Sequence, residues 1–260
     1  MSWTLAITGK GGVGKTTLAA LAVRWLTENG RGPVLAVDAD PNTCLDVLLG
    51  VRVTSAVGSV REEARQIVQA HATSTGGMGK QHLLEMKIEQ SLIETDRFDL
   101  IAMGRPEGPG CYCYANNVLS AALRKLADAY PAVVIDNEAG LENLSRRIVQ
   151  RVDHLLFVAD PSARGLATAR RLYDLAVEMH IEAGVLGVVI NRARDDQCLH
   201  RARGFFDGTP VEVFGSVPDD PEFGSRDAGG EPIWTLPRES PVFKAAEEIF
   251  RAPNPVVGTR

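Results

Sequence analysis

The sequence predicts an α/β fold in three layers, with a mostly parallel central sheet of about seven or eight strands covered by helices on both faces. Short apolar runs alternate with helical patterns along the 260 residues, which is typical of βαβ units. A glycine-rich phosphate-binding motif follows the first apolar run, and acidic residues end two others. We expect a single domain over residues 1–260, with a frayed Pro-rich tail after about residue 251.

The expected strands are the apolar runs, which in chain order are Trp3–Thr8, Val34–Asp38, Asp99–Met103, Ala132–Asp136, His154–Ala159, Leu186–Asn191 and Val211–Gly215. The expected helices cover residues 15–29, 59–71, 80–94, 114–129, 141–151, 162–179 and 240–251. Right-handed crossovers between parallel strands place ligands at the carboxyl ends of the strands. The apolar face of the last helix is expected to dock on the sheet; it consists of Val242, Phe243, Ala246, Ile249 and Phe250.

Composition argues against several classes of partner. The net charge is −5 and basic residues form no patch, so no nucleic acid is expected. No apolar run approaches the length of a membrane span. The polar face of the last helix sets Lys244 and Arg251 against Glu247 and Glu248, so no membrane association is expected either. The N-terminus enters a strand without signal-peptide features, which predicts a cytoplasmic location and reduced cysteines.

Residues Gly9 to Thr16 match the spacing G-x-x-x-x-G-K-[ST] between an apolar strand and an Ala/Leu-rich helix. The glycines let backbone N–H groups turn around phosphates, and the start of the helix adds the positive end of its dipole. Lys15 is expected to reach the β- and γ-phosphates, and the Thr16 hydroxyl to join a Mg²⁺ shell. The motif predicts the P-loop NTPase fold. The expected nucleotide-binding residues here are Gly11, Gly12, Val13, Gly14, Lys15, Thr16 and Thr17.

With a further lysine at position 10, the stretch Gly9-Lys10-Gly11-Gly12-Val13-Gly14-Lys15-Thr16-Thr17 resembles the deviant-Walker branch of P-loop ATPases. That branch includes the nitrogenase iron protein, the arsenite-pump ATPase and the cell-division-site and plasmid-partition ATPases. The resemblance implies a nucleotide-bridged homodimer in which Lys10 reaches the phosphates bound by the other copy. From the residues alone, a solvated lysine is the alternative.

Two carboxylates, Asp38 and Asp40, follow the apolar run that begins at Val34. Hydrolysis needs a carboxylate near Mg²⁺ and a group that orients the attacking water. In the resembled branch the second Asp of D-x-D-P positions this water, so Asp40 is expected to be catalytic, together with Lys10 and Lys15. Asp38 is expected to lie beside Mg²⁺. The alternative is that Asp40 caps a short helix at residues 42–49.

A second apolar strand ends at Asp136, which is expected to hold Mg²⁺ through water. The residues that follow, Asn137-Glu138-Ala139-Gly140, give a D-x-x-A-G spacing that resembles the second switch of the same branch. Gly140 is expected to swing its N–H toward the γ-phosphate, so that hydrolysis changes the order of this segment.

The residues from Val189 to Arg194 favour adenine over guanine. A guanine-specific protein carries N-K-x-D, whose Asp accepts from the base, whereas Arg194 at the fourth position offers no acceptor. ATP is therefore the expected nucleotide, with Asn191 and Arg192 at the base and, by resemblance, Pro218 flanking it. The alternative is an Asn that simply ends a strand.

Cys111 and Cys113 lie one residue apart on a Gly/Pro-rich stretch, residues 104–116. Thiolates are soft ligands that suit Zn²⁺, Cu(I), iron–sulfur clusters and Ni²⁺. Two thiolates cannot complete a tetrahedral site, but a symmetric dimer supplies four on its two-fold axis. The alternative is a pair of small buried apolar side chains, which is what we expect of Cys44 and Cys198. The spacing and the loop favour metal binding at the pair.

Two segments together closely resemble the nickel-insertion accessory ATPases of carbon monoxide dehydrogenase and their acetyl-CoA synthase relatives. They are Gly104–Asn117, which contains Gly-Pro-Gly-Cys-Tyr-Cys-Tyr, and Asp136–Arg147. The likeness runs from Ser2 to about Phe250. It implies ATP-dependent delivery of Ni²⁺ to the cluster of carbon monoxide dehydrogenase by a homodimer that forms on ATP or metal binding. Zn²⁺ is able to occupy the same thiolates.

Three alternatives remain open at this point. The loop also resembles that of the nitrogenase iron protein, which would make the chain an ATP-driven iron–sulfur electron carrier. That protein needs a second cysteine beyond its second switch, and this chain has none between Asp136 and Gln150. The client would be acetyl-CoA synthase in the second alternative. In the third, the chain is an ATP-gated positioning module like the division-site ATPases.

Overall fold

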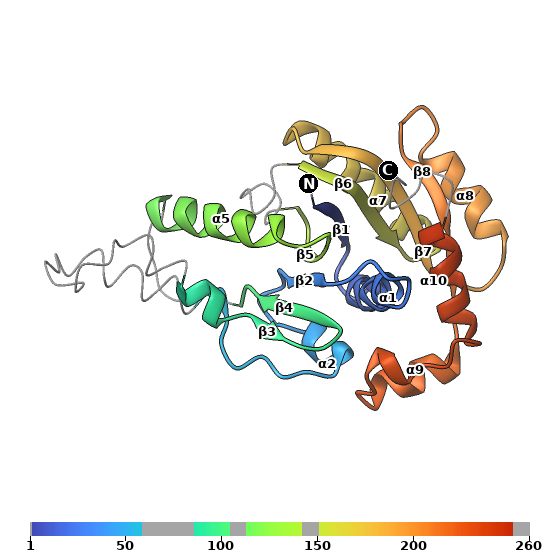
Figure 1. Cartoon of the computed structure of the whole chain (residues 1–260). Coiled ribbons are helices and arrows are strands. Elements are labelled where there is room, and N and C mark those ends of the chain that lie inside the picture. The colour runs from blue at the N-terminus through green and yellow to red at the C-terminus, as the bar shows by residue number, and fades with distance from the viewer. Residues whose placement is uncertain (1, 59–85, 105–112, 142–150, 252–260) are drawn as a thin grey trace, which may run out of the picture.

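The computed structural model describes residues 2–58, 86–104, 113–141 and 151–251. These residues form a sheet of eight strands in the order β3-β4-β2-β5-β1-β6-β7-β8 (Figure 1). Only the pairing of β3 with β4 is antiparallel in this described sheet. The strands are β1 Trp3–Gly9, β2 Val34–Asp38, β3 Ile93–Glu94, β4 Phe98–Ala102, β5 Ala132–Ala139, β6 Arg151–Ala159, β7 Glu182–Ala193 and β8 Glu212–Pro218.

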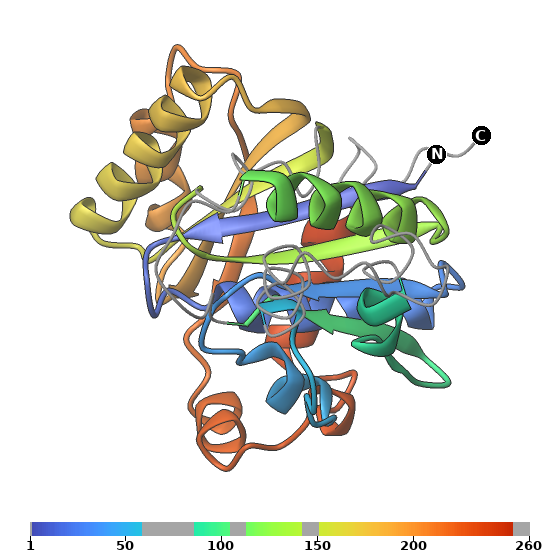
Figure 2. The ribbon, with the colours of Figure 1, turned by 90° about the vertical axis from the view of Figure 1, so that its left-hand side faces the viewer.

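Helices cover both faces of the sheet, so the three-layer α/β fold is confirmed (Figures 1 and 2). Side chains alternate along β1: Leu5 and Ile7 join one core cluster, and Ala6 joins the other. The helices are α1 Lys15–Glu28, α2 Leu45–Leu49, α5 Cys113–Asp128, α7 Ala163–Glu178, α8 Gln197–Phe205, α9 Pro221–Ala228, α10 Pro241–Arg251 and the 3₁₀-helix η1 Ile233–Thr235. Helices α1, α2 and α10 pack on the first cluster, and α5, α7 and α8 on the second. None of the described helices is long and apolar enough to cross a bilayer.

Most of the predicted elements are confirmed, with ends that shift by a few residues. All seven expected strands are present, as are the expected helices at 15–29, 114–129, 162–179 and 240–251. The expected apolar face of the last helix is buried in the core. The helix expected at 59–71 and the tail after residue 251 lie outside the described residues.

Two predicted helices need correction. Residues 86–90 are helical, but Ile93 and Glu94, which the pattern placed in the same helix, form β3. A turn closed by Thr95, whose hydroxyl and N–H both donate to the Phe98 carbonyl, folds this segment back onto β4. The helix expected at 141–151 is wrong at its end, because Arg151 already begins β6; residues 142–150 are outside the described part. Helices α8 and α9 were not predicted from the sequence.

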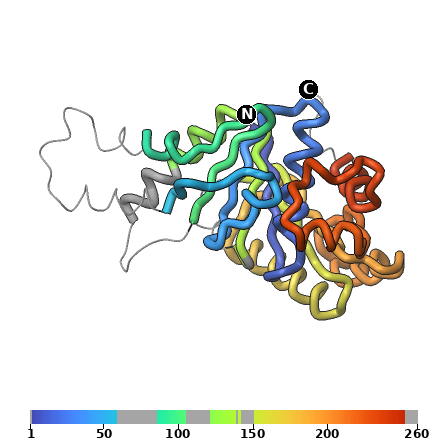
Figure 3. Tube along the Cα trace, turned by 90° about the horizontal axis from the view of Figure 1, so that it is seen from below, coloured from blue at the N-terminus to red at the C-terminus, as the bar shows by residue number. Residues whose placement is uncertain are grey.

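Helix α1, which carries the phosphate-loop lysine, is fastened to the C-terminal segment by Arg24. This side chain is only 4% exposed. Its guanidinium donates to the carbonyl oxygens of Ile233 and Leu236, each at 2.7 Å, and pairs with Glu28 at 2.7 Å. It also lies 4.2 Å from the centre of the Phe243 ring. Figure 3 shows this C-terminal segment running beside α1.

Replacing Arg24 tests this attachment. Arg24→Met leaves buried carbonyls without donors and removes a buried charge pair, so we expect the free energy of unfolding to fall by about 2–4 kcal/mol. Arg251→Met is the matched control, because it breaks an exposed pair with Glu247 on α10 and should change stability by less than about 0.5 kcal/mol. Urea unfolding followed by circular dichroism measures both. Equal, small losses would contradict the attachment.

Candidate nucleotide-binding site

The carboxyl ends of β1, β2 and β5 lie side by side at one edge of the sheet. Parallel pairing sets Ile7 of β1 opposite Asp136 of β5, and Asp136 opposite Asp38 of β2. The glycine-rich loop leaves β1 at Gly9, and α1 begins at Lys15. The loop and both predicted magnesium carboxylates are thus brought together where parallel α/β sheets bind ligands.

The loop curls back on itself in front of α1. Gly12 and Gly14 have φ angles of 73° and 95°, values that residues with a side chain rarely adopt. The Lys10 carbonyl accepts from the N–H of Val13 at 3.4 Å and from the Lys15 ammonium at 3.3 Å. Lys15 is buried, whereas Lys10 is exposed. No side chain caps the start of the 14-residue helix α1, and the N–H groups at such a helix start favour an anion there.

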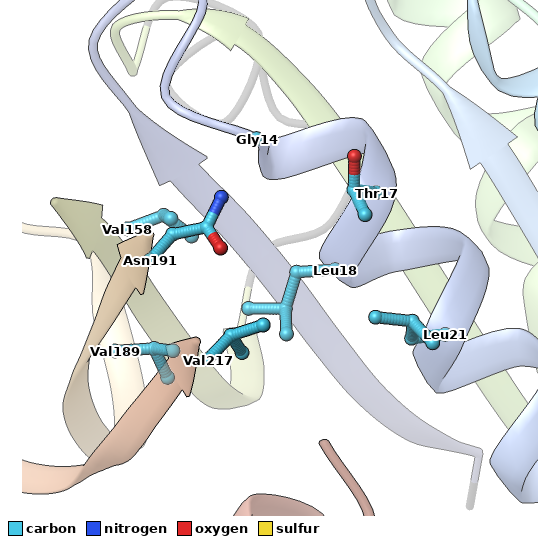
Figure 4. Close-up of a pocket in the computed structure, with 8 residues that line it drawn as sticks. All are labelled: Gly14, Thr17, Leu18, Leu21, Val158, Val189, Asn191 and Val217. Atoms are coloured by element: carbon cyan, nitrogen blue, oxygen red, sulfur yellow. The ribbon is translucent and has the colours of Figure 1, made fainter. Parts of the chain in front are cut away.

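The end of β7 braces this loop through Asn191. Its amide Nδ2 donates to the Val13 carbonyl at 2.8 Å. A Cβ on Gly14 would lie 2.1 Å from the same nitrogen, so the position has no room for a side chain. In Figure 4 the amide nitrogen of Asn191 points toward Gly14. The described contact of Asn191 is thus with the loop, and its place near adenine stays a prediction.

A small cavity lies beneath the loop (Figure 4). Its volume is about 10 Å³, roughly the room that one water needs. The lining residues are Gly14, Thr17, Leu18, Leu21, Val158, Val189, Asn191 and Val217. Because the space is small and largely apolar, it belongs to the packed base of the loop and is too small for a nucleotide.

The other predicted base-side residues lie at the same edge. Arg192 follows Asn191 with a φ of 56°, an unusual value for a residue with a side chain. Pro218 ends β8, and Ala193 pairs with it across the two strands. Beyond them, Arg194 pairs with Asp219 at 2.9 Å on the surface. Asn191, Arg192 and Pro218 are therefore neighbours, as a shared binding site requires.

Asp136 is a buried carboxylate whose negative charge is only partly compensated by its surroundings. It is 1% exposed, and no hydrogen bond of ordinary geometry from the described residues reaches its oxygens, although the Thr16 hydroxyl lies close enough to lower its pKa. Burial raises its pKa to about 7, and Asp38 and Asp40 push in the same direction, while the nearby Thr16 hydroxyl and Lys15 ammonium act against the rise. A hard divalent cation such as Mg²⁺ would supply the missing charge. The residues present here fit that ion.

The buried negative charge of Asp38 is compensated by backbone N–H donors. It is fully buried, and its carboxylate accepts from the N–H groups of Asp40, Cys44 and Leu45 at 3.0, 2.9 and 3.0 Å. Burial raises its pKa, and these three hydrogen bonds lower it. Asp38 therefore caps α2, and the alternative that Asp40 caps this helix is wrong. Asp40 instead accepts from the N–H and amide of Asn42.

The two cysteines that were expected to be buried differ. Cys198 is fully buried, as predicted. Cys44 is exposed, which corrects the expectation, because Thr43 before it adopts a φ of 51° and turns the chain into α2 at the surface. Partial desolvation and the carboxylates of Asp38, Asp40 and other acids raise the pKa of the Cys44 thiol. A raised thiol pKa disfavours the thiolate, which is the form that binds a metal.

The predicted metal pair falls mostly outside the described residues. Cys111 is not among them, whereas Cys113 is the first residue of α5. Because α5 connects β4 to β5 by a parallel crossover, its first residue lies at the carboxyl edge of the sheet, the same edge as the phosphate loop. Within the described ranges, no cluster of three or more His, Cys, Asp or Glu residues could hold a metal ion.

Together the fold and this edge define a P-loop nucleotide-binding protein. The chain belongs to the family described as the CobQ/CobB/MinD/ParA nucleotide binding domain, whose model matches residues 4–233. This is a family of ATP-binding P-loop ATPases, and ATP with Mg²⁺ is the ligand pair that it implies.

Three comparisons illustrate the family relationship. The uncharacterized ATP-binding protein MJ0685 of Methanocaldococcus jannaschii is 40% identical over 245 residues, which covers 94% of this chain and 96% of that protein. The carbon monoxide dehydrogenase accessory protein CooC of Rhodospirillum rubrum is 30% identical over 246 residues, or 89% of each chain. The MinD cell division protein of Aquifex aeolicus has the same fold, with a TM-score of 0.68 and 23% identity over 96% of this chain and 95% of that one.

The environment of Asp136 predicts a pH dependence of stability. Its folded pKa of about 7 exceeds the value of 3.8 expected when unfolded, so the native state holds the proton more tightly. Stability of the metal-free protein therefore falls as pH rises from about 4 to about 7. Asp136→Asn removes this decline, and its stability relative to wild type should improve by on the order of 3 kcal/mol between pH 4 and pH 8.

Thermal or urea unfolding in chelator across this range measures the difference. Asp153→Asn is the control, because that carboxylate accepts from the N–H of Thr4 at the opposite end of β1. A stability difference between Asp136→Asn and wild type that stays constant with pH would contradict the assigned environment.

Proposed function

We propose that this protein is an ATP-dependent metal carrier that supports nickel insertion into carbon monoxide dehydrogenase. Ni²⁺ would be bound by Cys111 and Cys113 from each of two copies. The observation that carries the proposal is the position of Cys113, which opens α5 at the edge of the sheet that holds the phosphate loop. The similarity to CooC, named a carbon monoxide dehydrogenase accessory protein, supports the same client.

The nucleotide side of the proposal uses residues at the ends of β1, β2 and β5. Thr16 and Asp136 would hold Mg²⁺, with Asp38 beside it, and the ion would neutralise charge on the phosphates. Lys15 would contact the β- and γ-phosphates. Asp40 would orient the attacking water; its Oδ1 accepts from Asn42, and the N–H groups at the start of α2 are bound by Asp38 instead. Lys10 is exposed, as a residue must be if it is to reach a second copy.

The metal side depends on the thiolates of Cys111 and Cys113, of which Cys113 is the first residue of α5. The amino end of a helix stabilises the charged form of a cysteine, and a soft ion such as Ni²⁺ or Zn²⁺ prefers that form. One copy supplies only two such ligands, so a tetrahedral site needs both copies. Partial desolvation and then nearby carboxylates raise the pKa of the exposed Cys44 thiol, so Cys44 is not proposed as a further ligand.

ATP and metal would be coupled because both act at the same edge. A nucleotide that bridges two copies brings their α5 helices together, and a shared metal does the same. Each ligand then favours the dimer that the other needs, and the coupling is equal in both directions. Hydrolysis by way of Asp40 would release the nucleotide contribution and leave the metal free to transfer.

Two rival functions predict different experimental results. An iron–sulfur electron carrier of the nitrogenase-iron-protein type would be a coloured, iron-containing dimer after anaerobic purification. A factor for acetyl-CoA synthase would activate nickel-free acetyl-CoA synthase and leave nickel-free carbon monoxide dehydrogenase unchanged. Reconstitution of each enzyme with the nickel-loaded protein and ATP distinguishes the clients.

The decisive variant is the double substitution Cys111→Ser/Cys113→Ser. The wild-type protein should bind one Ni²⁺ per dimer, and the variant should bind it at least about 100-fold more weakly, since hard hydroxyls replace the soft ligands. Cys44→Ser is the matched control and should bind as wild type. Equilibrium dialysis with metal analysis, alongside light scattering for mass, gives both affinity and stoichiometry. Undiminished binding by the double variant would overturn the proposed site.

A further inference from the structure

Thr8 makes a hydrogen bond that joins the phosphate loop to the end of β5. It is the residue before Gly9, where the loop begins, and it is fully buried. Its hydroxyl Oγ1 donates to the Gly140 carbonyl at 2.7 Å. Gly140 belongs to the D-x-x-A-G segment, so a buried side chain of β1 holds the backbone of that segment directly.

Asn137 makes a second link between the same two strands. It is 1% exposed, and its amide Nδ2 donates to the Ile7 carbonyl at 3.0 Å. The pairing of β1 with β5 shifts register between Ile7 and Gly9, so that Gly9 comes to lie opposite Ala139. The hydrogen bond from the Asn137 side-chain amide to the Ile7 carbonyl lies at this irregularity in the pairing. The two hydrogen bonds thus attach β5 and Gly140, which directly follows it, to consecutive residues of β1 just before the phosphate loop.

The backbone at Gly140 shows what the Thr8 bond controls. Its φ of 125° lies in a region that residues with side chains rarely adopt. A Cβ built there would meet nothing within 4 Å among the described residues, so the backbone angle favours glycine here and lack of space does not. The Gly140 carbonyl and the Leu141 N–H belong to one planar trans peptide and point in opposite directions. Holding the carbonyl on Thr8 therefore fixes the direction of the Leu141 N–H.

We propose that Thr8 is a positioning residue for ATP hydrolysis. Its hydroxyl orients the Gly140–Leu141 peptide relative to the phosphate loop, so that backbone donors of this segment are aligned with the terminal phosphate before reaction. Donors that are aligned in advance accelerate a reaction because they need no rearrangement in the transition state. The inference rests on the ATP-hydrolysing part of the proposed function and is independent of nickel and of the client.

The test compares Thr8→Val with Thr8→Ser. Valine keeps the shape of threonine and removes the donor, so kcat for ATP should fall about fivefold, while KM for ATP and the affinity for ADP change less than about twofold. Serine keeps the donor and should restore kcat to within about twofold of wild type. Rates are expressed per ADP-binding site, so that unfolded protein does not count. Thr4→Val removes a hydroxyl from the other end of β1 and should leave kcat unchanged.

Two results would overturn the proposal. One is a kcat of Thr8→Val equal to that of wild type. The other is a loss in Thr8→Ser as large as in Thr8→Val, which would mean that packing of the methyl group matters and the hydroxyl does not. Because Cys111 and Cys113 stay intact in all these variants, nickel stoichiometry measured on the same samples reports separately on the metal-carrier proposal.

Discussion

The parallel register of β2, β5 and β1 is the constraint on which the rest of the site depends. It places Asp38, Asp136 and the start of the phosphate loop next to one another, with both carboxylates buried. Two neighbouring buried carboxylates are costly unless each finds compensation. Asp38 finds it in three backbone N–H groups, whereas no hydrogen bond of ordinary geometry from the described part of the chain reaches the oxygens of Asp136. Asp38 therefore holds the turn that leads into α2, whereas a divalent cation is the compensation that would suit Asp136.

Hydrogen bonds also connect the nucleotide-binding edge to the C-terminal segment around η1. Asp38 caps α2, and the carbonyl of Leu49 at the end of α2 accepts from the Trp234 indole at 2.9 Å. Arg24 binds α1 to the same segment at Ile233. Helices α1 and α2, which both follow strands that end at the nucleotide-binding edge, are therefore both attached to the segment around η1. On the opposite face α5 begins at the edge itself, and that placement is what would link nucleotide binding to the cysteine pair.

The parts of the fold that follow from local pattern could be predicted from the sequence. The apolar strands and the glycine loop before Lys15 are confirmed, because each is set by residues next to one another, whereas β5 continues to Ala139, three residues beyond the predicted strand end at Asp136. β3 was missed because a two-residue edge strand is created by the neighbouring β4 and the Thr95 turn. The capping role of Asp38 and the Thr8 contact with Gly140 depend on chain segments that meet only in the folded sheet. Contacts between segments that are distant in the sequence cannot be predicted from a local sequence pattern.

The central claim is that ATP and a thiolate-bound metal act on one dimer through a shared edge of the sheet. The most direct test measures Ni²⁺ affinity with and without ATP in Asp40→Asn, which is expected to bind ATP without hydrolysing it, and ATP affinity with and without Ni²⁺. The account predicts that each ligand tightens binding of the other by the same factor, at least about tenfold. Affinities for either ligand that ignore the presence of the other would contradict it.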